Sequence, residues 1–297
     1  MTRRIWRVMA AAGLPALMAT EGSTQQSGWT TVFDGLVVAQ DDANLSGGGS
    51  FSSSRAFLRG GALYRDDDLS YGFLLSLGEY SYDFATPGAA PWDDVRDIRI
   101  SAPVRFRTNG GAKVFVSPQL RWDYENDASA SDGFTYGVFA GVTWQVSPNL
   151  EIGPAFGAFS ELESNDIDLF PALLVNWQMT DQWSLGTSTA AGASQGPGVS
   201  LRYQASRSTS LSLSTRYERT RFRLDNTGLA PGGIGQDSSV PVVLSVDYKP
   251  NPGLSFNAFV GMEFDGELKL EESSGATVSR QSYDDALIAG LAFRVLF

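Results

Sequence analysis

The sequence predicts an all-β protein, a closed antiparallel up-and-down β-barrel of about fourteen strands that crosses a membrane. Three observations predict this fold class. Apolar and polar residues alternate along most of the chain, so that many segments have the two faces of a β-strand. Short turns and longer polar loops follow each other in a regular order. Aromatic residues recur close to the short turns, as they do at the rims of membrane barrels.

Three segments, 114–124, 136–146 and 254–264, show the alternation most clearly. Their even-numbered positions carry mainly large apolar residues, and their odd-numbered positions are mostly polar, charged or small. Each segment has about the 9–11 residues that a tilted strand needs to cross hydrocarbon. A soluble barrel would show the same period with its apolar face inward. The bulk of these side chains favours an outward apolar face, because the inside of a closed barrel could hold few of them.

The connections between the strands differ at the two ends of the predicted barrel. One end has short turns and the other has mostly longer polar loops, which is typical of membrane barrels. The short turns are 66–68, 108–111, 147–149, 180–182, 206–209 and 250–253. The loops are 41–53, 86–94, 126–133, 163–166, 190–196, 225–239 and 271–281.

The short turns join twelve strands, and the two ends of the chain supply two more. The last strand, about 283–297, returns to the short-turn end. A first strand, about 29–39, would pair with it and bring the total to fourteen, an even number as in bacterial single-chain barrels. Asp34 interrupts the alternation of this first strand. The alternative is that residues 29–53 form a plug or a periplasmic extension, which leaves a barrel of twelve strands.

The amino terminus has the outline of a secretory signal peptide. Arginines near the start precede an apolar run, Val8–Met18, and a polar stretch follows. Cleavage after Ala19 would remove the signal peptide, residues 1–19. A short polar segment, 20–28, would then precede the barrel, 29–297. An amphipathic anchor is the alternative interpretation of the same residues.

The chain ends on Phe297, inside a strand whose odd-numbered residues from Leu287 onward form one apolar face. This ending resembles the closing strand of bacterial outer-membrane β-barrels. Residues 54–297 as a whole resemble the uncharacterised, porin-like outer-membrane β-barrel families of Gram-negative bacteria. The resemblance rests on the export signal, the strand rhythm, the aromatic residues and the terminal Phe. It implies the Gram-negative outer membrane as the location, with membrane lipid and lipopolysaccharide as surroundings. It also implies that the barrel-assembly machinery reads Phe297, and it leaves the oligomeric state open.

The composition excludes several classes of function. The chain has no histidine and no cysteine, so it lacks the residues of Ser-His and Cys-His catalysis and the usual ligands of a zinc site. We therefore expect no enzymatic activity and no cofactor. The formal net charge of -11, without a compensating basic face, argues against nucleic acid as a partner. The run Asp66–Asp68 is read as a solvated turn, because a cation site needs more oxygen ligands.

Two sets of residues follow from the strand assignment. Aromatic residues beside the short turns predict a periplasmic girdle, since their rings suit the boundary between lipid and water. These are Tyr64, Trp144, Trp177, Trp183, Tyr203 and Tyr248. Charged residues on the less apolar face of their strands are candidates for lining the lumen. These are Arg99, Arg105, Arg107, Arg121, Asp123, Glu125, Arg202, Arg216, Glu218, Glu263 and Asp265.

The lumen charges support two functions. Separate basic and acidic walls would make a passive, porin-like channel for small polar solutes. Alternatively, opposite charges could pair and lock the lumen, which would make a non-conducting structural or surface-interaction barrel. The arginine-rich segment Arg216–Arg223 could bind lipopolysaccharide phosphates, or it could be an ordinary solvated strand end.

Overall fold

The computed structural model describes residues 27–85, 90–164, 166–187 and 198–297. The predicted signal peptide 1–19, most of the polar segment 20–28 and the predicted loop 190–196 lie outside the described residues. The division of the chain into these parts stays a prediction.

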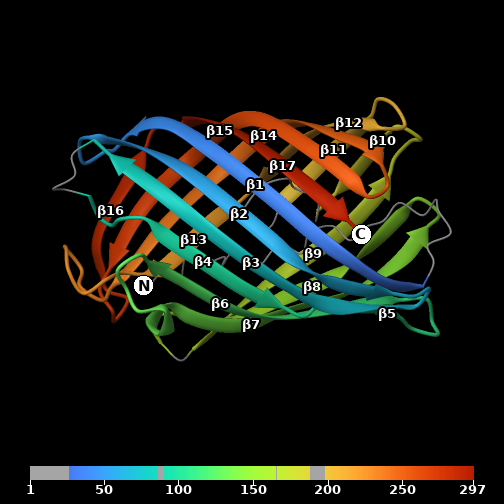
Figure 1. Cartoon of the computed structure of the whole chain (residues 1–297), viewed down its shortest axis with the longest axis horizontal. Helices are drawn as coiled ribbons and strands as arrows, with labels where there is room; N and C mark the ends of the chain where they lie inside the picture. The colour runs from blue at the N-terminus through green and yellow to red at the C-terminus, as the bar shows by residue number, and fades with distance from the viewer. Residues whose placement is uncertain (1–26, 86–89, 165, 188–197) are drawn as a thin grey trace, which may run out of the picture.

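One sheet of seventeen β-segments closes on itself as a barrel, with the loop-bearing end at the left of Figure 1 and the short-turn end at the right. The segments are β1 (Gly28–Asn44), β2 (Ser50–Arg65), β3 (Leu69–Phe84), β4 (Val95–Ser101), β5 (Val104–Arg107), β6 (Lys113–Glu125), β7 (Phe134–Ser147), β8 (Leu150–Ser160), β9 (Ile167–Gln178), β10 (Trp183–Gly186), β11 (Gly198–Gln204), β12 (Thr209–Arg216), β13 (Glu218–Arg223), β14 (Ile234–Asn251), β15 (Leu254–Glu271), β16 (Thr277–Tyr283) and β17 (Ala286–Leu296). A 3₁₀ turn, η2 (Ala130–Gly133), precedes β7. Within the described residues, no helix has the length and apolar character needed to cross a membrane.

Three strands of the barrel are each interrupted once. β4 and β5 both pair with β3 and β6, β12 and β13 both pair with β14, and β16 and β17 both pair with β15. The seventeen segments therefore make a barrel of fourteen strands. β1 closes it by pairing antiparallel with β17 on one side and β2 on the other. The predicted fourteen-stranded closed barrel is confirmed, and the twelve-stranded alternative, with residues 29–53 as a plug, is wrong.

The first strand tolerates Asp34 because this residue faces the interior. Its carboxylate accepts hydrogen bonds from Arg59 on β2 and Arg294 on β17, the two strands that flank β1. The charge therefore sits in a row of inward-facing positions and leaves the outward row apolar.

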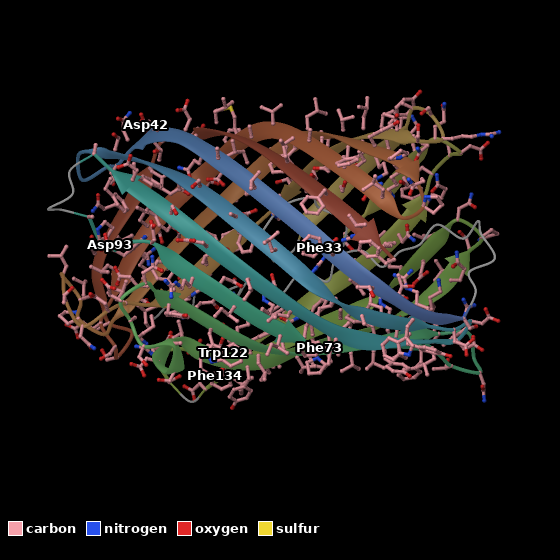
Figure 2. The ribbon with its side chains drawn as sticks, in the orientation of Figure 1. Phe33, Asp42, Phe73, Asp93, Trp122 and Phe134 are labelled. Atoms are coloured by element: carbon pink, nitrogen blue, oxygen red, sulfur yellow. The ribbon has the colours of Figure 1, made fainter. Side chains whose placement is uncertain are left out.

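The outward face of the barrel is apolar and exposed over its middle. Leu58, Phe73 and Leu291 are 52%, 51% and 61% exposed, although they are large apolar residues. Figure 2 shows Phe73 and Phe134 along the outer edge of the ribbon, and Asp42 and Asp93 at the loop-bearing end. An exposed apolar band around a closed sheet is the pattern expected of a barrel surrounded by lipid.

Three predicted loops are shorter than expected. The segments 41–53, 225–239 and 271–281 contain the ends of β1, β2, β14, β15 and β16, which continue to pair. Here the exposed positions of the strands are mostly polar, and the buried positions include both apolar residues, such as Phe51, and polar ones, such as Asp237. Because these segments are rich in polar residues, their sequence is typical of loops, and the strand extensions were not predicted.

The barrel narrows at its loop-bearing end. β12 pairs with β11, but its continuation β13 makes a parallel bridge with β6 between Arg223 and Tyr124. β6, β13, β14, β15, β16, β1, β2, β3 and β4 thus form a narrow ring there. Tyr124, predicted to face outward, is buried because η2 covers it: a Cβ on Gly133 would lie 2.9 Å from the Cβ of Tyr124.

Candidate functional site

The interior of the narrow ring is filled by a cluster that we call the aromatic core. Phe51 contacts Tyr283 with ring centroids 5.0 Å apart, and Trp92 contacts Phe222 at 5.1 Å, both edge to face. Tyr82 also contacts Trp92, at 5.7 Å. These aromatic side chains come from β2, β3, the segment before β4, β13 and β16. They therefore meet from different sides of the narrow end of the barrel. The members of the aromatic core are Phe51, Tyr80, Tyr82, Phe84, Trp92, Phe222 and Tyr283.

On the short-turn side of the aromatic core, the side chain of Arg55 on β2 reaches across the lumen. We call its ion pairs the cross-lumen bridge. Its guanidinium lies 2.8 Å from a carboxylate oxygen of Glu218 on β13 and 2.9 Å from one of Glu263 on β15. β2 and β13 are not neighbours in the sheet, so the contact ties opposite walls together. Arg216 shares Glu218. Asp237 accepts hydrogen bonds from two tyrosine hydroxyls of the aromatic core.

A second group of charges lies flat on the wall formed by β4 and β6. Arg99 donates to Asp97 at 2.9 Å, and Arg121 lies 2.9 Å from Asp123 and 3.5 Å from Asp97. Two basic and two acidic side chains therefore balance each other. Glu125, at the end of β6, accepts hydrogen bonds from the backbone N–H groups of residues 93 and 225 and ties two connecting segments to the wall.

A phenylalanine wall lines the interior of β6 to β9. Phe139 and Phe159 each stack on Phe170, with ring centroids 6.1 Å apart in both pairs. Glycine makes room for the rings, since a Cβ on Gly157 would lie 1.8 Å from the Phe170 ring. The sequence did not predict this wall, although a signal is visible: Phe115, Phe139 and Phe159 stand on the faces of their strands that are otherwise polar or small. The wall consists of Phe115, Phe139, Phe159 and Phe170.

The interior at the short-turn end carries a band of positive charge that we call the basic ring. Its members face inward from β2, β5, β6, β11, β14 and β17: Arg59, Arg65, Arg105, Lys113, Arg202, Lys249 and Arg294. Three acidic residues lie among them: Asp34, Glu151 and Asp247. Lys113 pairs with Glu151 at 2.7 Å and Arg202 with Asp247 at 3.6 Å. The side chains of Lys113, Arg294 and Arg202 keep 42%, 35% and 28% of their surface exposed.

The structure divides the predicted lumen residues between these groups. Arg105 and Arg202 belong to the basic ring. Seven others face inward nearer the loops: Arg99, Arg121, Asp123, Glu125, Arg216, Glu218 and Glu263. Arg107 lies at the short-turn rim, 3.7 Å from Asp68.

The prediction for Asp265 is wrong. It sits in a bulge with φ 51° and is exposed, because Gly266 takes the inward place beside the ring of Tyr283. The bulge shifts the parity of β15 by one residue, which a strict alternation rule does not foresee.

Several interior charges were not predicted from the sequence. The signal that could have found three of them is the shared parity of Arg55, Arg59 and Arg65 in β2, opposite the apolar Ala56 and Leu58. The remaining missed residues are Asp34, Asp97, Lys113, Glu151, Asp237, Asp247, Lys249 and Arg294.

The aromatic residues of the predicted girdle lie beside the short turns. Trp183 contacts Tyr203 with ring centroids 5.0 Å apart. Tyr64 contacts Trp29, which is 61% exposed and was not predicted. Phe297 ends the chain at the same rim, where its backbone N–H donates to the carbonyl of Thr31. The other exposed members are Trp144, Trp177 and Tyr248.

The arginine-rich segment makes its contacts within the protein. Arg221 lies 2.9 Å from Glu163 and also pairs with Glu271. Arg223 donates to the backbone carbonyls of residues 132, 162 and 232. These bonds hold the β8–β9 connection against β13, and lipopolysaccharide binding by this segment stays a prediction. Among the described residues, no group of three or more acidic side chains could hold a metal ion.

The closed sheet, the outward apolar band and the charged interior define a β-barrel of the outer-membrane type. The chain belongs to the family described as Domain of unknown function (DUF6268), whose model matches residues 126–289, more than half of its length.

Several solved structures are similar to this chain at low sequence identity. The COG4313 outer membrane channel from Pseudomonas putida F1 is 12% identical, with a TM-score of 0.50 over 93% of this chain and 97% of that chain. The Ralstonia pickettii toluene transporter TbuX is 11% identical, with a TM-score of 0.46 over 92% and 90%. A Pseudomonas aeruginosa FadL homologue is 12% identical, with a TM-score of 0.43 over 91% and 90%. These likenesses concern the fold alone. No curated protein matches the sequence.

Proposed function

We propose that the protein is a passive channel for small polar solutes in the outer membrane of a Gram-negative bacterium, without enzymatic activity. The observation that carries the proposal is the accessible, charged inner face at the short-turn end. Lys113, Arg202 and Arg294 point into a closed barrel and keep part of their side chains exposed there. A barrel serving only as a scaffold has no need for accessible charges inside, because each one loses solvation unless water or a solute reaches it.

A second candidate, a non-conducting structural barrel, is favoured by a different observation. The aromatic core fills the narrow ring, and Arg55 ties Glu218 to Glu263 across the lumen beneath it. Passage along the barrel axis requires this bridge to open. The two candidates therefore differ in whether the bridge is a gate or a permanent lock.

Conductance of the purified protein in a planar lipid bilayer tests the proposal. The informative variant is Arg55→Met/Glu263→Gln, which removes the bridge without leaving a lone charge, because Arg216 still pairs with Glu218. The matched control is Arg280→Gln/Glu267→Gln, an exposed ion pair at the loop-bearing end.

For a channel, we expect the wild type to conduct, the Arg55→Met/Glu263→Gln variant to conduct several-fold more, and the control to match the wild type. A wild type that never conducts, beside an Arg55→Met/Glu263→Gln variant that does, supports the locked barrel instead. No current from either one rejects the channel function.

A further inference from the structure

We propose that the basic ring selects small soluble anions bearing carboxylate or phosphate oxygens, and that it makes the channel anion-selective. This inference rests on the proposed channel function. It names the class of solute that the short-turn half of the lumen would take.

The basic ring carries more positive charge than its acidic neighbours can neutralise. Each of the three acidic residues serves two basic ones. Asp34 binds Arg59 and Arg294. Glu151 faces Lys113 and Arg105, and Asp247 faces Arg202 and Lys249. Arg65 is left over, since it forms no ion pair within the part of the chain that the structure describes.

The positive side chains are close enough to repel one another around the wall. Arg294 interacts unfavourably with Arg59, Arg65 and Lys249. Arg65 in turn repels Arg105, and Lys249 repels Arg202. These repulsions act between side chains of β17, β2, β5, β14 and β11. A soluble anion entering the ring would relieve this repulsion, which is stronger inside a barrel than in bulk water because the walls have a low dielectric constant.

The composition of the chain does not explain the ring. The formal net charge of the whole protein is -11, and the wall charges on β4 and β6 are balanced. The surplus is local to the short-turn half of the interior. Guanidinium groups present several N–H donors in a planar fork that fits two oxygens of a carboxylate or phosphate. Chemistry and charge therefore favour the same class of solute.

The reversal potential in a salt gradient tests this proposal. The wild type is compared in bilayers of zwitterionic lipid without lipopolysaccharide, in potassium chloride, acetate and phosphate. Two variants alter the ring at Arg65 and Lys249, neither of which forms a salt bridge within the described residues: Arg65→Gln/Lys249→Gln and Arg65→Glu/Lys249→Glu. The control, Arg96→Gln/Arg280→Gln, removes the same charge from exposed sites outside the lumen. Every protein is also studied with the bridge opened by Arg55→Met/Glu263→Gln, so that current is measurable.

We expect the wild type to prefer anions several-fold, the glutamine variant to lose most of that preference and the glutamate variant to prefer cations. The control should keep the wild-type value. A conducting wild type without anion preference, or a glutamine variant that retains it, overturns the inference while the channel function stands. Anion preference that appears only after lipopolysaccharide is added assigns the ring to lipid phosphate and also overturns it.

If no protein conducts, the channel function fails, and binding decides the inference on its own. Inorganic phosphate should raise the unfolding temperature of the detergent-solubilised wild type and leave that of Arg65→Gln/Lys249→Gln unchanged. Equal shifts in both proteins would show that the ring binds no anion.

Discussion

The two halves of the barrel interior solve the problem of buried charge in opposite ways. In the loop-bearing half, Arg55, Arg121 and their acidic partners are paired, and an aromatic core fills the remaining space. In the short-turn half, basic residues outnumber acidic ones and remain partly exposed. An interior that is filled and whose basic residues are paired stabilises the fold, whereas one with a surplus of accessible basic residues leaves charge for an anion to meet. The same sheet thus encloses one half that is filled and paired and one half that is charged and accessible.

The orientation of the barrel decides which half of the interior faces the cell exterior, and a test of this orientation has the largest expected effect. Cysteines at Ser129 and Asn226, both exposed in loops, should label from outside intact cells with a membrane-impermeant maleimide. A cysteine at Asn251, exposed in a short turn, should label only after the outer membrane is opened. Because the protein has no native cysteine, it gives no background labelling by the maleimide. The reverse pattern would place the basic ring towards the outside.

Because the two halves pair their charges differently, removing one arginine should cost more stability in the loop-bearing half than in the short-turn half. Arg55→Met leaves Glu218 and Glu263 without their cross-lumen partner, in a place where Arg55 itself is only 7% exposed. Removing one partner of a buried ion pair costs about 3–5 kcal/mol. Arg59→Met, in the short-turn half, leaves Asp34 paired with Arg294 and should cost about 0–1 kcal/mol.

The measurement is urea-induced unfolding in detergent, followed by tryptophan fluorescence. Arg55→Met/Glu263→Gln should recover much of the stability that Arg55→Met loses, because less charge is left unpaired. Equal losses for Arg55→Met and Arg59→Met would contradict the division of the interior into a paired and an accessible half.

The sequence reveals the barrel but not its narrowing. Strict alternation, as in 114–124, identifies the strands and their outward faces, because it reflects local backbone geometry. The bridge between Arg223 and Tyr124 is a contact between distant parts of the chain, and no periodic pattern announces it. The ion pair of Arg55 with Glu218 joins residues 163 positions apart. Parity can place both side chains inside, but the height at which they meet depends on the register of the whole sheet.

The smallest expected effect concerns Glu271, which lies at the end of β15, beyond the apolar band. Burial disfavours its carboxylate, but the hydrogen bond from Lys269 and the charges of Arg221 and Lys269 outweigh burial. These interactions hold the pKa of Glu271 below its usual value. A carboxyl group with a lowered pKa in the folded state contributes stability above its unfolded pKa, near 4.3, and this contribution is lost as the pH falls through the folded value.

Glu271→Gln should therefore be less stable than the wild type at neutral pH. The gap should close as the pH falls below about 4, because protonation of the wild-type carboxyl removes the same interactions. Unfolding midpoints at several pH values measure this difference, with Glu272→Gln as the control because Glu272 is the exposed neighbour. A gap that stays constant with pH would mean that the Arg221 and Lys269 pairs add nothing beyond packing. The ion pairs of Glu271 with Arg221 and Lys269 would then be neutral for stability.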